Sequence, residues 1–594
     1  MGWPYHFLDL TSEQKHQRRY LLDWYGSLAQ ISVFVPLLAA QGYFLFIWAN
    51  RRWVGQGNSD APNSPHAKRQ RVNGTGRVRS VTETARKVAW WAGNSLDVFG
   101  YHLGTNGDAL AALLWAAWLL LLCVLQTGDD YMHITKRFGT VASSQLPFQY
   151  LLALKSPYSP LQVLTRSSHE TLNVLHQHLG YILTALFYLH GALYVNYYVI
   201  NDLLWAKLKE PYIICGIVSI IAFTAVGTTA LTPVRKWSYR VFYITHVTLA
   251  AALLPVLFFH VSHIRIYLYE TVAIYALNTL LRASNTDSMS GTVKLLPNSS
   301  LLEINIPLPK AASGKQPSKW HPGQHAYVSL AGHPFLRTFR SNPFTVASIP
   351  AADGSLTFIA RVLDGNTAKL ARQADDRKLS TQMMSVEGPY GVATHADKLL
   401  GYDRILLVAG GVGGTFLVPL YRQLLEDLSP SKGSYRRQRV SFLWVARSKA
   451  DVTWALPADV KEKEGFAERL EVRLTGNITD ATAVDNGFEI SSDREEDTAA
   501  YGEPKGGIEL EEQKQLLSND QDEDGGTDSC ALKFAAGRPH IARIVDQTFA
   551  HGFTEKVAVV VCGPQKLNAA LRKEVGRYVA RGRDVWFWDE SFAF

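Results

Sequence analysis

The sequence predicts a multidomain membrane protein: an all-α transmembrane bundle, then an antiparallel β-barrel, then an α/β domain with a parallel sheet. The 594 residues are about four times the usual size of one domain. Apolar stretches long enough to span lipid recur between residues 28 and 283 and then stop. Beyond residue 284, runs that alternate β-branched and polar residues give way to strand, glycine loop and helix units. A purely soluble enzyme is therefore excluded.

Hydropathy and charge predict the topology. The candidate spans are residues 28–49, 108–127, 141–157, 172–199, 211–231, 239–261 and 263–283. Residues 51–87 carry nine Lys or Arg against two acidic residues, which places this segment in the cytosol by the positive-inside rule. Counting the spans in both directions from this segment places the N-terminus outside and the C-terminal domains in the cytosol. We expect a multi-pass protein in contact with membrane lipid, with its first span retained as an anchor.

The remaining composition excludes other classes. The net charge of +8 conceals an acidic stretch, residues 480–528, with 16 acidic and 3 basic residues. Much of the positive charge lies beside predicted spans, so we attribute it to topology and expect no nucleic-acid partner. The four cysteines show no paired spacing, which argues against both a disulfide framework and a thiolate zinc site.

Changes of pattern along the chain predict the domain boundaries. Residues 1–107 hold the first span and the basic cytosolic loop, and residues 108–283 form the main transmembrane domain. Residues 284–400 form the barrel and residues 401–594 the α/β domain. We expect the acidic stretch 480–528 to be a disordered insertion in this last domain, because it is too poor in apolar residues to join the sheet.

Four histidines in the spans form two equally spaced pairs. His176 and His190 are 14 residues apart in one span, and His246 and His260 are 14 apart in another. Fourteen helical residues turn through roughly 1400° and rise about 21 Å, so each pair lies on one face, near opposite leaflets. Because both spans run outward, His176 should face His246 and His190 should face His260. Intramembrane imidazoles are costly and usually functional, so we predict ligands for two b-type haems rather than ordinary polar bundle residues.

The sequence around these histidines resembles that of a known family. The run RFGTVASSQLPFQYLLALKSPYSPLQVLTRSSHETLNVLHQHLG and the equal histidine spacing resemble the fungal ferric reductases, which are related to the NADPH oxidases. The resemblance covers nearly the whole chain from His133 onward. It implies a plasma-membrane reductase with two haems, FAD and NADPH, whose soluble part is similar to ferredoxin-NADP reductase. The chain departs from the family pattern at His178, Tyr181 and Arg240.

The barrel segment contains a motif similar to the family's flavin site. Arg340-Ser-Asn-Pro-Phe-Thr345 resembles the His-Pro-Phe-Thr motif, with Asn342 in place of His. A flavin needs a flat apolar wall and a donor at its redox-active edge. The resemblance assigns the apolar wall to Phe344 and the donor to Thr345. It assigns binding of the FAD diphosphate to the guanidinium of Arg361. The residues it implies for FAD are Pro343, Phe344, Thr345, Arg361 and the terminal Phe592, with Phe594 as an alternative to Phe592.

The α/β segment contains a nicotinamide site. Gly410, Gly411, Gly413, Gly414 and Thr415 follow an apolar strand and open a helix, so their N–H groups can bind dinucleotide phosphates. A simple tight turn is the alternative.

Two further positions extend this site. Arg447 ends the next strand, where a cation suits a 2′-phosphate and favours NADPH over NADH. Val561-Cys-Gly-Pro564 resembles the family's nicotinamide-side motif. The resemblance implies that Cys562, Gly563 and Pro564 bind NADPH and that Cys562 is catalytic. A buried structural cysteine is the alternative.

Electron counting connects the predicted sites. NADPH delivers two electrons as hydride, haems accept one each, and only a flavin can divide the pair. We therefore predict an oxidoreductase that passes electrons from cytosolic NADPH through FAD and two haems to an external acceptor. The resemblance favours ferric or cupric chelates, in support of an iron permease and ferroxidase system. The alternative is an NADPH oxidase that makes superoxide, against which stand the extra N-terminal span and the equal histidine spacing. A haem-bearing transporter or passive cytochrome would not need the flavin and nicotinamide motifs.

Overall fold

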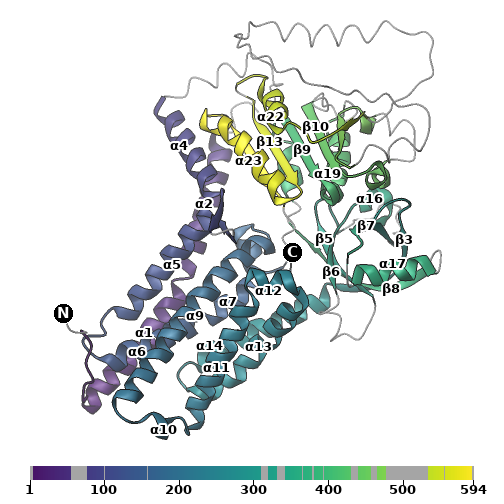
Figure 1. Cartoon of the computed structure of the whole chain (residues 1–594). Helices are drawn as coiled ribbons and strands as arrows, with labels where there is room; N and C mark the ends of the chain where they lie inside the picture. Colours follow the sequence, from purple (N-terminus) through teal and green to yellow (C-terminus); the bar gives the residue numbers. More distant parts are fainter. Residues whose placement is uncertain are drawn as a thin grey trace, which may run out of the picture.

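The computed structural model stacks three parts along the molecule: a helical bundle, an antiparallel sheet and a parallel sheet (Figure 1). The predicted fold class is confirmed. The structure describes residues 4–54, 76–98, 101–156, 158–309, 319–330, 341–363, 366–376, 380–391, 394–429, 439–456, 465–476, 533–553 and 555–590. The predicted insertion 480–528, together with Arg340, Phe592 and Phe594, lies outside these residues.

The bundle is built from long helices joined by short turns. In chain order its helices are α1 (Ser12–Ile31), α2 (Phe34–Val54), α5 (Asn106–Val124), α6 (Tyr131–Ser144), α7 (Leu146–Leu152), α8 (Pro160–Thr165), α9 (His169–Ile200), α10 (Leu204–Lys207), α11 (Pro211–Thr229), α12 (Thr232–Trp237), α13 (Tyr239–His260) and α14 (Arg265–Ser284). Among the described residues, five segments are long and apolar enough to cross a membrane: Ser12–Ala49, Asn106–Val124, His169–Ile200, Pro211–Thr229 and Tyr239–His260.

Two of the predicted spans need correction. The first, predicted at residues 28–49, begins at Ser12, and predicted span 141–157 is not among the five. Predicted span 263–283 is not among the five either, but the structure has the 20-residue helix α14 there, and this helix leads directly into the antiparallel sheet. The chain at 141–157 instead forms the end of α6 and the short helix α7. Helix α6 is buried among its neighbours, so it carries polar residues such as Thr135, Arg137 and Thr140 that a lipid-facing helix would not tolerate. Its neighbours, rather than lipid, satisfy these groups.

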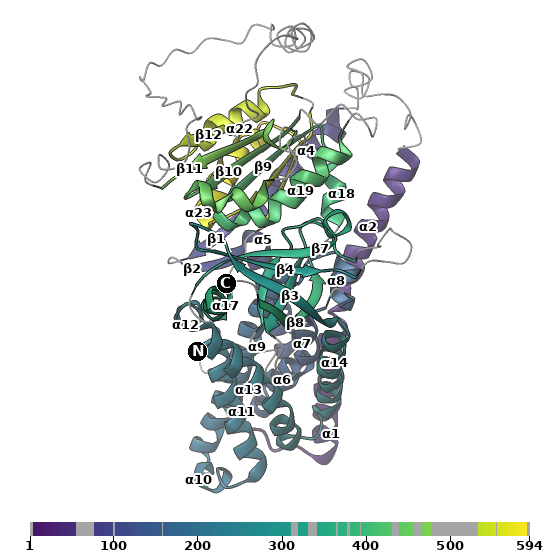
Figure 2. The ribbon, with the colours of Figure 1, turned by 90° about the vertical axis from the view of Figure 1, so that its right-hand side faces the viewer.

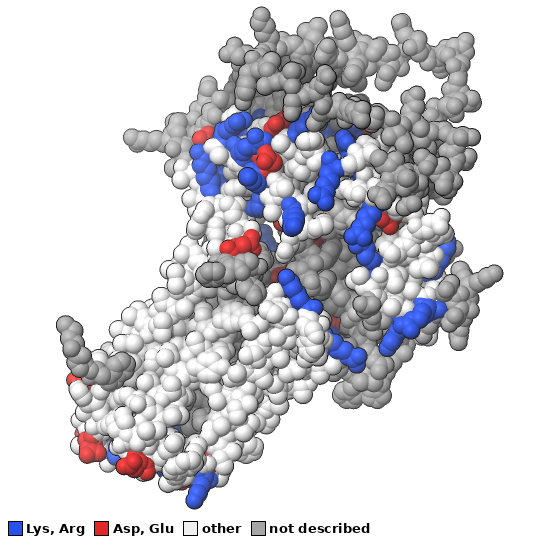
Figure 3. Space-filling model, in the orientation of Figure 1, with Lys and Arg blue, Asp and Glu red and all other residues white. Residues whose placement is uncertain are grey.

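The surface of the bundle is that of a membrane protein. Large apolar side chains are exposed on its outer helices, among them Leu113, Ile221 and Phe259 at 62–68% exposure. A band almost free of Lys, Arg, Asp and Glu covers the visible face of the bundle, and charged residues return at its far tip (Figure 3). An exposed apolar surface of this extent is stable only against lipid.

A second connection joins the bundle to the α/β domain. Helix α4 (Gly76–Ala92) and the hairpin of β1 (Ser95–Val98) and β2 (Tyr101–Thr105) precede α5, and α4 packs on α23 (Gln565–Ala580). Arg572 donates to Trp90 O at 3.1 Å and to Asn94 Oδ1 at 3.0 Å, while Asn106 of α5 donates through its backbone N–H to Asn94 O at 2.9 Å. The C-terminal end of α4 and the residues that follow it thus have hydrogen-bond partners in both the bundle and the α/β domain. The Arg572 cation lies at the C-terminal end of α4, which is the negative end of the helix dipole.

The antiparallel sheet follows α14 directly. Its strands are β3 (Thr286–Leu295), β4 (Leu301–Pro307), β5 (His325–Leu330), β6 (Asn342–Thr345), β7 (Ser355–Arg361) and β8 (Ser380–Tyr390), in the order β6-β5-β8-β3-β4-β7. A bridge between Val346 and Phe358 joins the two edges, so the sheet curves into the predicted barrel. Helices α16 (Pro350–Asp353) and α17 (Asn366–Asp376) lie beside it. The barrel lies between the bundle and the parallel sheet (Figure 2).

The parallel sheet has the order β12-β11-β10-β9-β13-β14. Its strands are β9 (Arg404–Gly410), β10 (Val440–Ala446), β11 (Leu470–Leu474), β12 (Lys533–Ala536), β13 (Val557–Cys562) and β14 (Val585–Asp589), and its helices are α18 (Thr394–Leu399), α19 (Gly414–Asp427), α22 (Ile541–Phe549) and α23. The chain leaves β9 for β10 on one side, and β13 lies on the other. The carboxyl end of β9 is therefore a switch point, where ligands bind in open α/β sheets.

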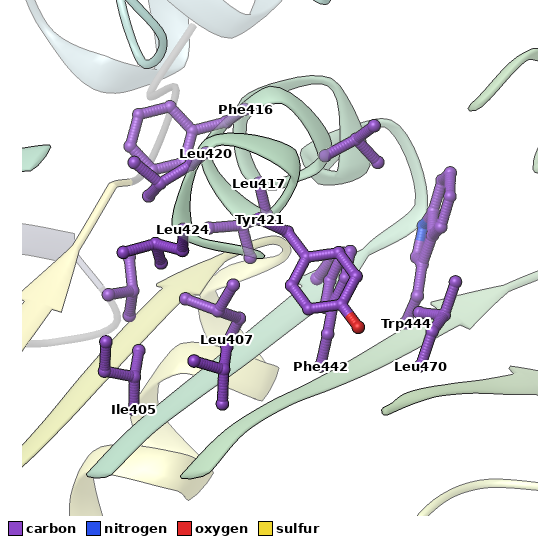
Figure 4. Packing of buried hydrophobic residues seen from close by; sticks show 14 of the residues in the cluster. Ile405, Leu407, Phe416, Leu417, Leu420, Tyr421, Leu424, Phe442, Trp444 and Leu470 are labelled. Carbon is purple, nitrogen blue, oxygen red and sulfur yellow. The ribbon is translucent and has the colours of Figure 1, made fainter. Parts of the chain in front are cut away.

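Helix α19 is held on the sheet by apolar packing. Phe416, Leu420 and Tyr421 are fully buried, and the Tyr421 ring lies over the strands beside Phe442, with ring centroids 5.2 Å apart (Figure 4). Each such side chain contributes about 1.5–3 kcal/mol when buried. This packing fixes the glycine turn that precedes α19.

Candidate functional site: two histidine pairs, a flavin motif and a nicotinamide loop

The structure brings the four predicted histidines together in the expected pairs. The ring centroids of His176 and His246 are 6.1 Å apart, and those of His190 and His260 are 6.4 Å apart. The two helices that carry them, α9 and α13, both start on the barrel side, with Ser168 and Ser238 as their N-caps (Figure 1). Both therefore run in the same direction, which is why equal spacing produces two matched pairs.

In three of the four rings, Nδ1 lies within hydrogen-bond distance of a backbone carbonyl oxygen, which bears on the ability of the ring to hold a metal. Nδ1 of His176 is 3.0 Å from Gln149 O, Nδ1 of His190 is 2.8 Å from Thr135 O, and Nδ1 of His260 is 2.7 Å from Tyr212 O. When Nδ1–H donates to a backbone carbonyl, the ring is oriented and Nε2 is left free as a ligand.

The separation of the rings fits a metal between them. Two metal–nitrogen bonds of about 2 Å each, with roughly 1 Å from nitrogen to ring centre on both sides, add up to about 6 Å. Glycines make room for the outer pair: a Cβ at Gly139 would be 2.7 Å from His190 Nδ1, and one at Gly216 would be 2.7 Å from His260 Cε1. The donor set, two imidazoles without thiolate, suits haem iron.

The flavin motif lies on an edge of the barrel sheet. Asn342–Thr345 forms β6, in which Phe344 is half-buried and Thr345 is buried. Arg361 ends β7, and its buried Nε has no hydrogen-bond partner among the described residues. It lines a hollow together with Gly411, Val412 and Trp454. A buried guanidinium with a free donor is suited to a phosphate, so Arg361 fits the role that the family resemblance gives it.

The glycine loop lies at the switch point of the parallel sheet. Gly411–Gly413 forms a single 3-10 turn between β9 and α19, and Gly411 has φ of +57°, a conformation that favours glycine. A Cβ at Gly413 would overlap Cys562 O, and one at Gly414 would overlap the Trp444 ring. Thr415 closes the turn by donating to Val412 O at 2.8 Å. The loop is thus too tightly packed for side chains at either position.

The second nicotinamide motif packs against this loop. Cys562 ends β13 and pairs with Ala409 of β9, and a Cβ at Gly410 would be 2.6 Å from Pro564 Cδ. Burial raises the pKa of the Cys562 thiol well above its usual range, and the Glu590 and Asp589 carboxylates add to this. The thiol is therefore neutral, a small uncharged group at the turn rather than a thiolate nucleophile.

Arg447 lies at the mouth of a cavity between the two soluble domains. It directly follows β10, and its exposed side chain lines a cavity of about 650 Å³ with Ser448 and Asp451 of the same domain and Lys294 of the barrel. This volume suits the adenosine end of a dinucleotide. Contact between Arg447 and a 2′-phosphate stays a prediction.

A polar cluster at the seam between bundle and barrel was not predicted. Arg282, in the last turn of α14, donates to Glu387 of β8 at 2.8 and 3.0 Å, and Tyr390 donates to the same carboxylate at 2.6 Å. Arg282 and the Tyr390 hydroxyl lower the pKa of Glu387 against the effect of its burial. These contacts fix the barrel on the bundle. No local motif marks these residues, because they come from distant elements.

Three family models match the chain in the order of its three parts. Residues 138–257 match a model described as ferric reductase like transmembrane component. Residues 288–394 match an FAD-binding domain, and residues 402–576 match a ferric reductase NAD binding domain. The chain therefore carries an FAD-binding and an NAD-binding domain behind a transmembrane bundle.

The chain is also similar in sequence to fungal proteins whose names describe metal reductases. A protein named "Probable metalloreductase AIM14" from Meyerozyma guilliermondii is 23% identical over 76% of this chain and 83% of its own length. The ferric/cupric reductase transmembrane component 2 of Saccharomyces cerevisiae is 24% identical over 75% of this chain and 59% of its own. A probable cell surface ferric reductase of Aspergillus oryzae is 26% identical over 59% and 49%. The chain thus resembles the ferric reductases in three segments, which match a transmembrane component, an FAD-binding domain and an NAD-binding domain in that order.

Proposed function

We propose that this protein carries electrons from cytosolic NADPH through FAD and two b-type haems to ferric chelates outside the membrane, with cupric chelates as a second acceptor class. The paired imidazoles of α9 and α13 carry this proposal, because they form two metal-sized gaps in a bundle that lies beneath a flavin-type barrel. The names of the fungal relatives support the choice of acceptor.

Different residues of the chain are proposed to bind NADPH, FAD and the two haems. The glycine loop and Arg447 bind and orient the dinucleotide, with the neutral Cys562 beside the site of hydride transfer. Arg361 binds the flavin diphosphate, and Phe344, Thr345 and Phe592 hold the ring. A bound flavin supplies the division of an electron pair into single electrons. His176 and His246 hold the inner haem, and His190 and His260 hold the outer haem.

The orientation follows from the basic loops. We place the soluble domains, the α4 segment and the basic helix α12 in the cytosol and the start of α1 outside. The plasma membrane is the proposed site, which fits a relative named as a cell surface protein. The reduced metal would then be available to an iron permease and ferroxidase system.

The test of this function compares acceptors side by side. Cells that express the protein, and cells that express a His176→Ala variant, are given a ferric chelate, a cupric chelate or oxygen. We expect external ferric reduction to exceed superoxide formation and to require His176. Superoxide as the main product would instead identify an oxidase.

The cofactor preference depends on Arg447. We expect Arg447→Glu to weaken NADPH far more than NADH, because a charge-assisted contact to the 2′-phosphate becomes a repulsion. Such contacts are worth about 1.5–3 kcal/mol, so KM for NADPH should rise about 10- to 100-fold. Steady-state kinetics with both nucleotides measures this. Equal losses with NADPH and NADH would show that Arg447 is only structural.

A further inference from the structure

A buried histidine that is not among the predicted haem or cofactor ligands lies at the seam between bundle and barrel. His325 begins β5 and is 8% exposed. Its Nε2 lies 3.5 Å from Oε1 of Glu170, and its ring stacks on Tyr390 with centroids 5.6 Å apart and 27° between the planes. The ring is thus held in place, and one nitrogen faces a carboxylate.

The strand pairing brings His325 next to the flavin motif. In the register of β5 and β6, His325 is the direct partner of Thr345. Directly paired residues of an antiparallel sheet have their side chains on the same face, with Cβ atoms about 5 Å apart. His325 therefore lies beside the residue that is proposed to meet the redox-active edge of the flavin.

Glu170 extends from this buried position toward solvent. It lies in the first turn of α9, the helix that carries His176 and His190. Its side chain is 45% exposed, whereas that of His325 is 10% exposed. The two side chains thus form a short path that begins inside the seam and ends at water on the cytosolic side.

The charges around His325 favour a neutral ring that can accept a proton. Burial lowers the pKa of His325, the Glu170 carboxylate opposes this, and the Lys155 ammonium adds to the lowering. Tyr390, which stacks on the His325 ring, donates to Glu387, and Glu387 in turn pairs with Arg282. The titratable or charged groups that face this site from the surrounding elements are Lys155, His169, Glu170, Arg282, Tyr327, Glu387, Tyr390 and Glu590.

The reaction requires a route for a proton. A hydride brings two electrons and one proton to the flavin, and the haems accept only the electrons. We propose that His325 and Glu170 form the outlet for this proton. If a bound flavin passed its two electrons on to bound haems, one proton would be left behind; the His325 imidazole would accept it and release it from Nε2 to Oε1 of Glu170, and Glu170 would release it to water. This inference rests on the proposed function and adds the path of the proton to that of the electron.

The test separates hydride transfer from proton release. The full-length protein, loaded with FAD and haem, is mixed with NADPH in weak buffer that contains a pH indicator, and flavin, haem and indicator absorbance are recorded together. His325→Phe keeps a ring on Tyr390, and Glu170→Gln keeps the shape of the carboxylate. We expect flavin reduction at the wild-type rate, with proton release and haem reduction slowed by about tenfold or more.

Two pH measurements add readouts that a structural role would not change. Because the neutral imidazole is the acceptor, haem reduction in the wild type should quicken as the pH rises through the pKa of His325 and should lose this dependence in His325→Phe. In a spectroelectrochemical titration, the midpoint potential of the flavin plotted against pH should show a break at the same pKa. That break should be absent in His325→Phe.

Matched variants make the result specific. Asp287→Asn removes a carboxylate of the same barrel that pairs with Lys319 on the surface, and it should leave all rates unchanged. Wild-type proton release in both His325→Phe and Glu170→Gln would overturn the proposal. So would slower release in Glu590→Gln alone, since burial and Glu170 raise the pKa of Glu590 to about 7 and make it a rival acceptor. Wild-type haems that NADPH cannot reduce would overturn the proposed function itself, and the outlet with it.

Discussion

Replacing His176 or His246 with alanine is expected to remove the inner haem and to stop reduction of external acceptors, while NADPH still reduces a soluble dye through the flavin. The ring centroids of His176 and His246 are 6.1 Å apart, so under the proposed function each imidazole would be one of two ligands to the haem iron, and a single imidazole would not be enough to hold the haem. The flavin and nicotinamide sites lie on separate domains and keep their own contacts. Haem content per chain, external ferric reduction and dye reduction measure the three effects.

The matched control is His178→Ala on the same helix. Two residues rotate an α-helix by about 200°, so His178 points away from the pair and its loss should leave haem content unchanged. His190→Ala should give an intermediate result: the inner haem is still reduced by NADPH but cannot pass its electron outward. External reductase activity that survives in His176→Ala or His246→Ala would contradict the ligand assignment.

Gly413→Ala is expected to abolish the reaction with NADPH. The added Cβ would overlap the backbone carbonyl oxygen of Cys562, which cannot rotate away as a side chain could. The turn and the end of β13 must then separate, at a cost of about 1–3 kcal/mol or more. Both nicotinamide motifs are disturbed by this one change. NADPH-dependent dye reduction and thermal unfolding of the protein measure the effect.

A glycine of the same domain supplies the control for this substitution. A Cβ at Gly552 would meet only Glu555 Cγ, at an ordinary contact distance of 3.7 Å. Gly552→Ala should therefore keep both NADPH reactivity and stability near the wild-type values. If Gly413→Ala also kept NADPH reactivity and stability near the wild-type values, the close packing of the glycine loop against Cys562 would not be needed for function.

The parts of the molecule with a regular repeat could be predicted from the sequence. The equal spacing of His176, His190, His246 and His260 gave the correct pairing, because helix geometry converts spacing into direction. The order of strand, glycine loop and helix likewise located the switch point of the parallel sheet. In both cases a short stretch of sequence is enough to determine how the residues are arranged.

Features that depend on distant contacts could not be predicted. Helix α6 was partly missed because Arg137 and its polar neighbours are buried by protein, which hydropathy cannot distinguish from exposure to water. The docking of Trp90 and Asn94 on Arg572 joins residues nearly 500 positions apart. His325 and Glu170 meet only because α9 and β5 begin at the same seam. None of these contacts leaves a motif in the sequence.

The central claim is that electrons from NADPH cross the bundle on two bis-histidine haems by way of the flavin. Absorption spectra of the purified full-length protein, recorded after addition of NADPH with and without FAD, test it most directly. The account predicts two haems per chain with spectra typical of two imidazole ligands, both reduced by NADPH only when FAD is present. A single haem per chain, or haems that NADPH reduces without FAD, would contradict it.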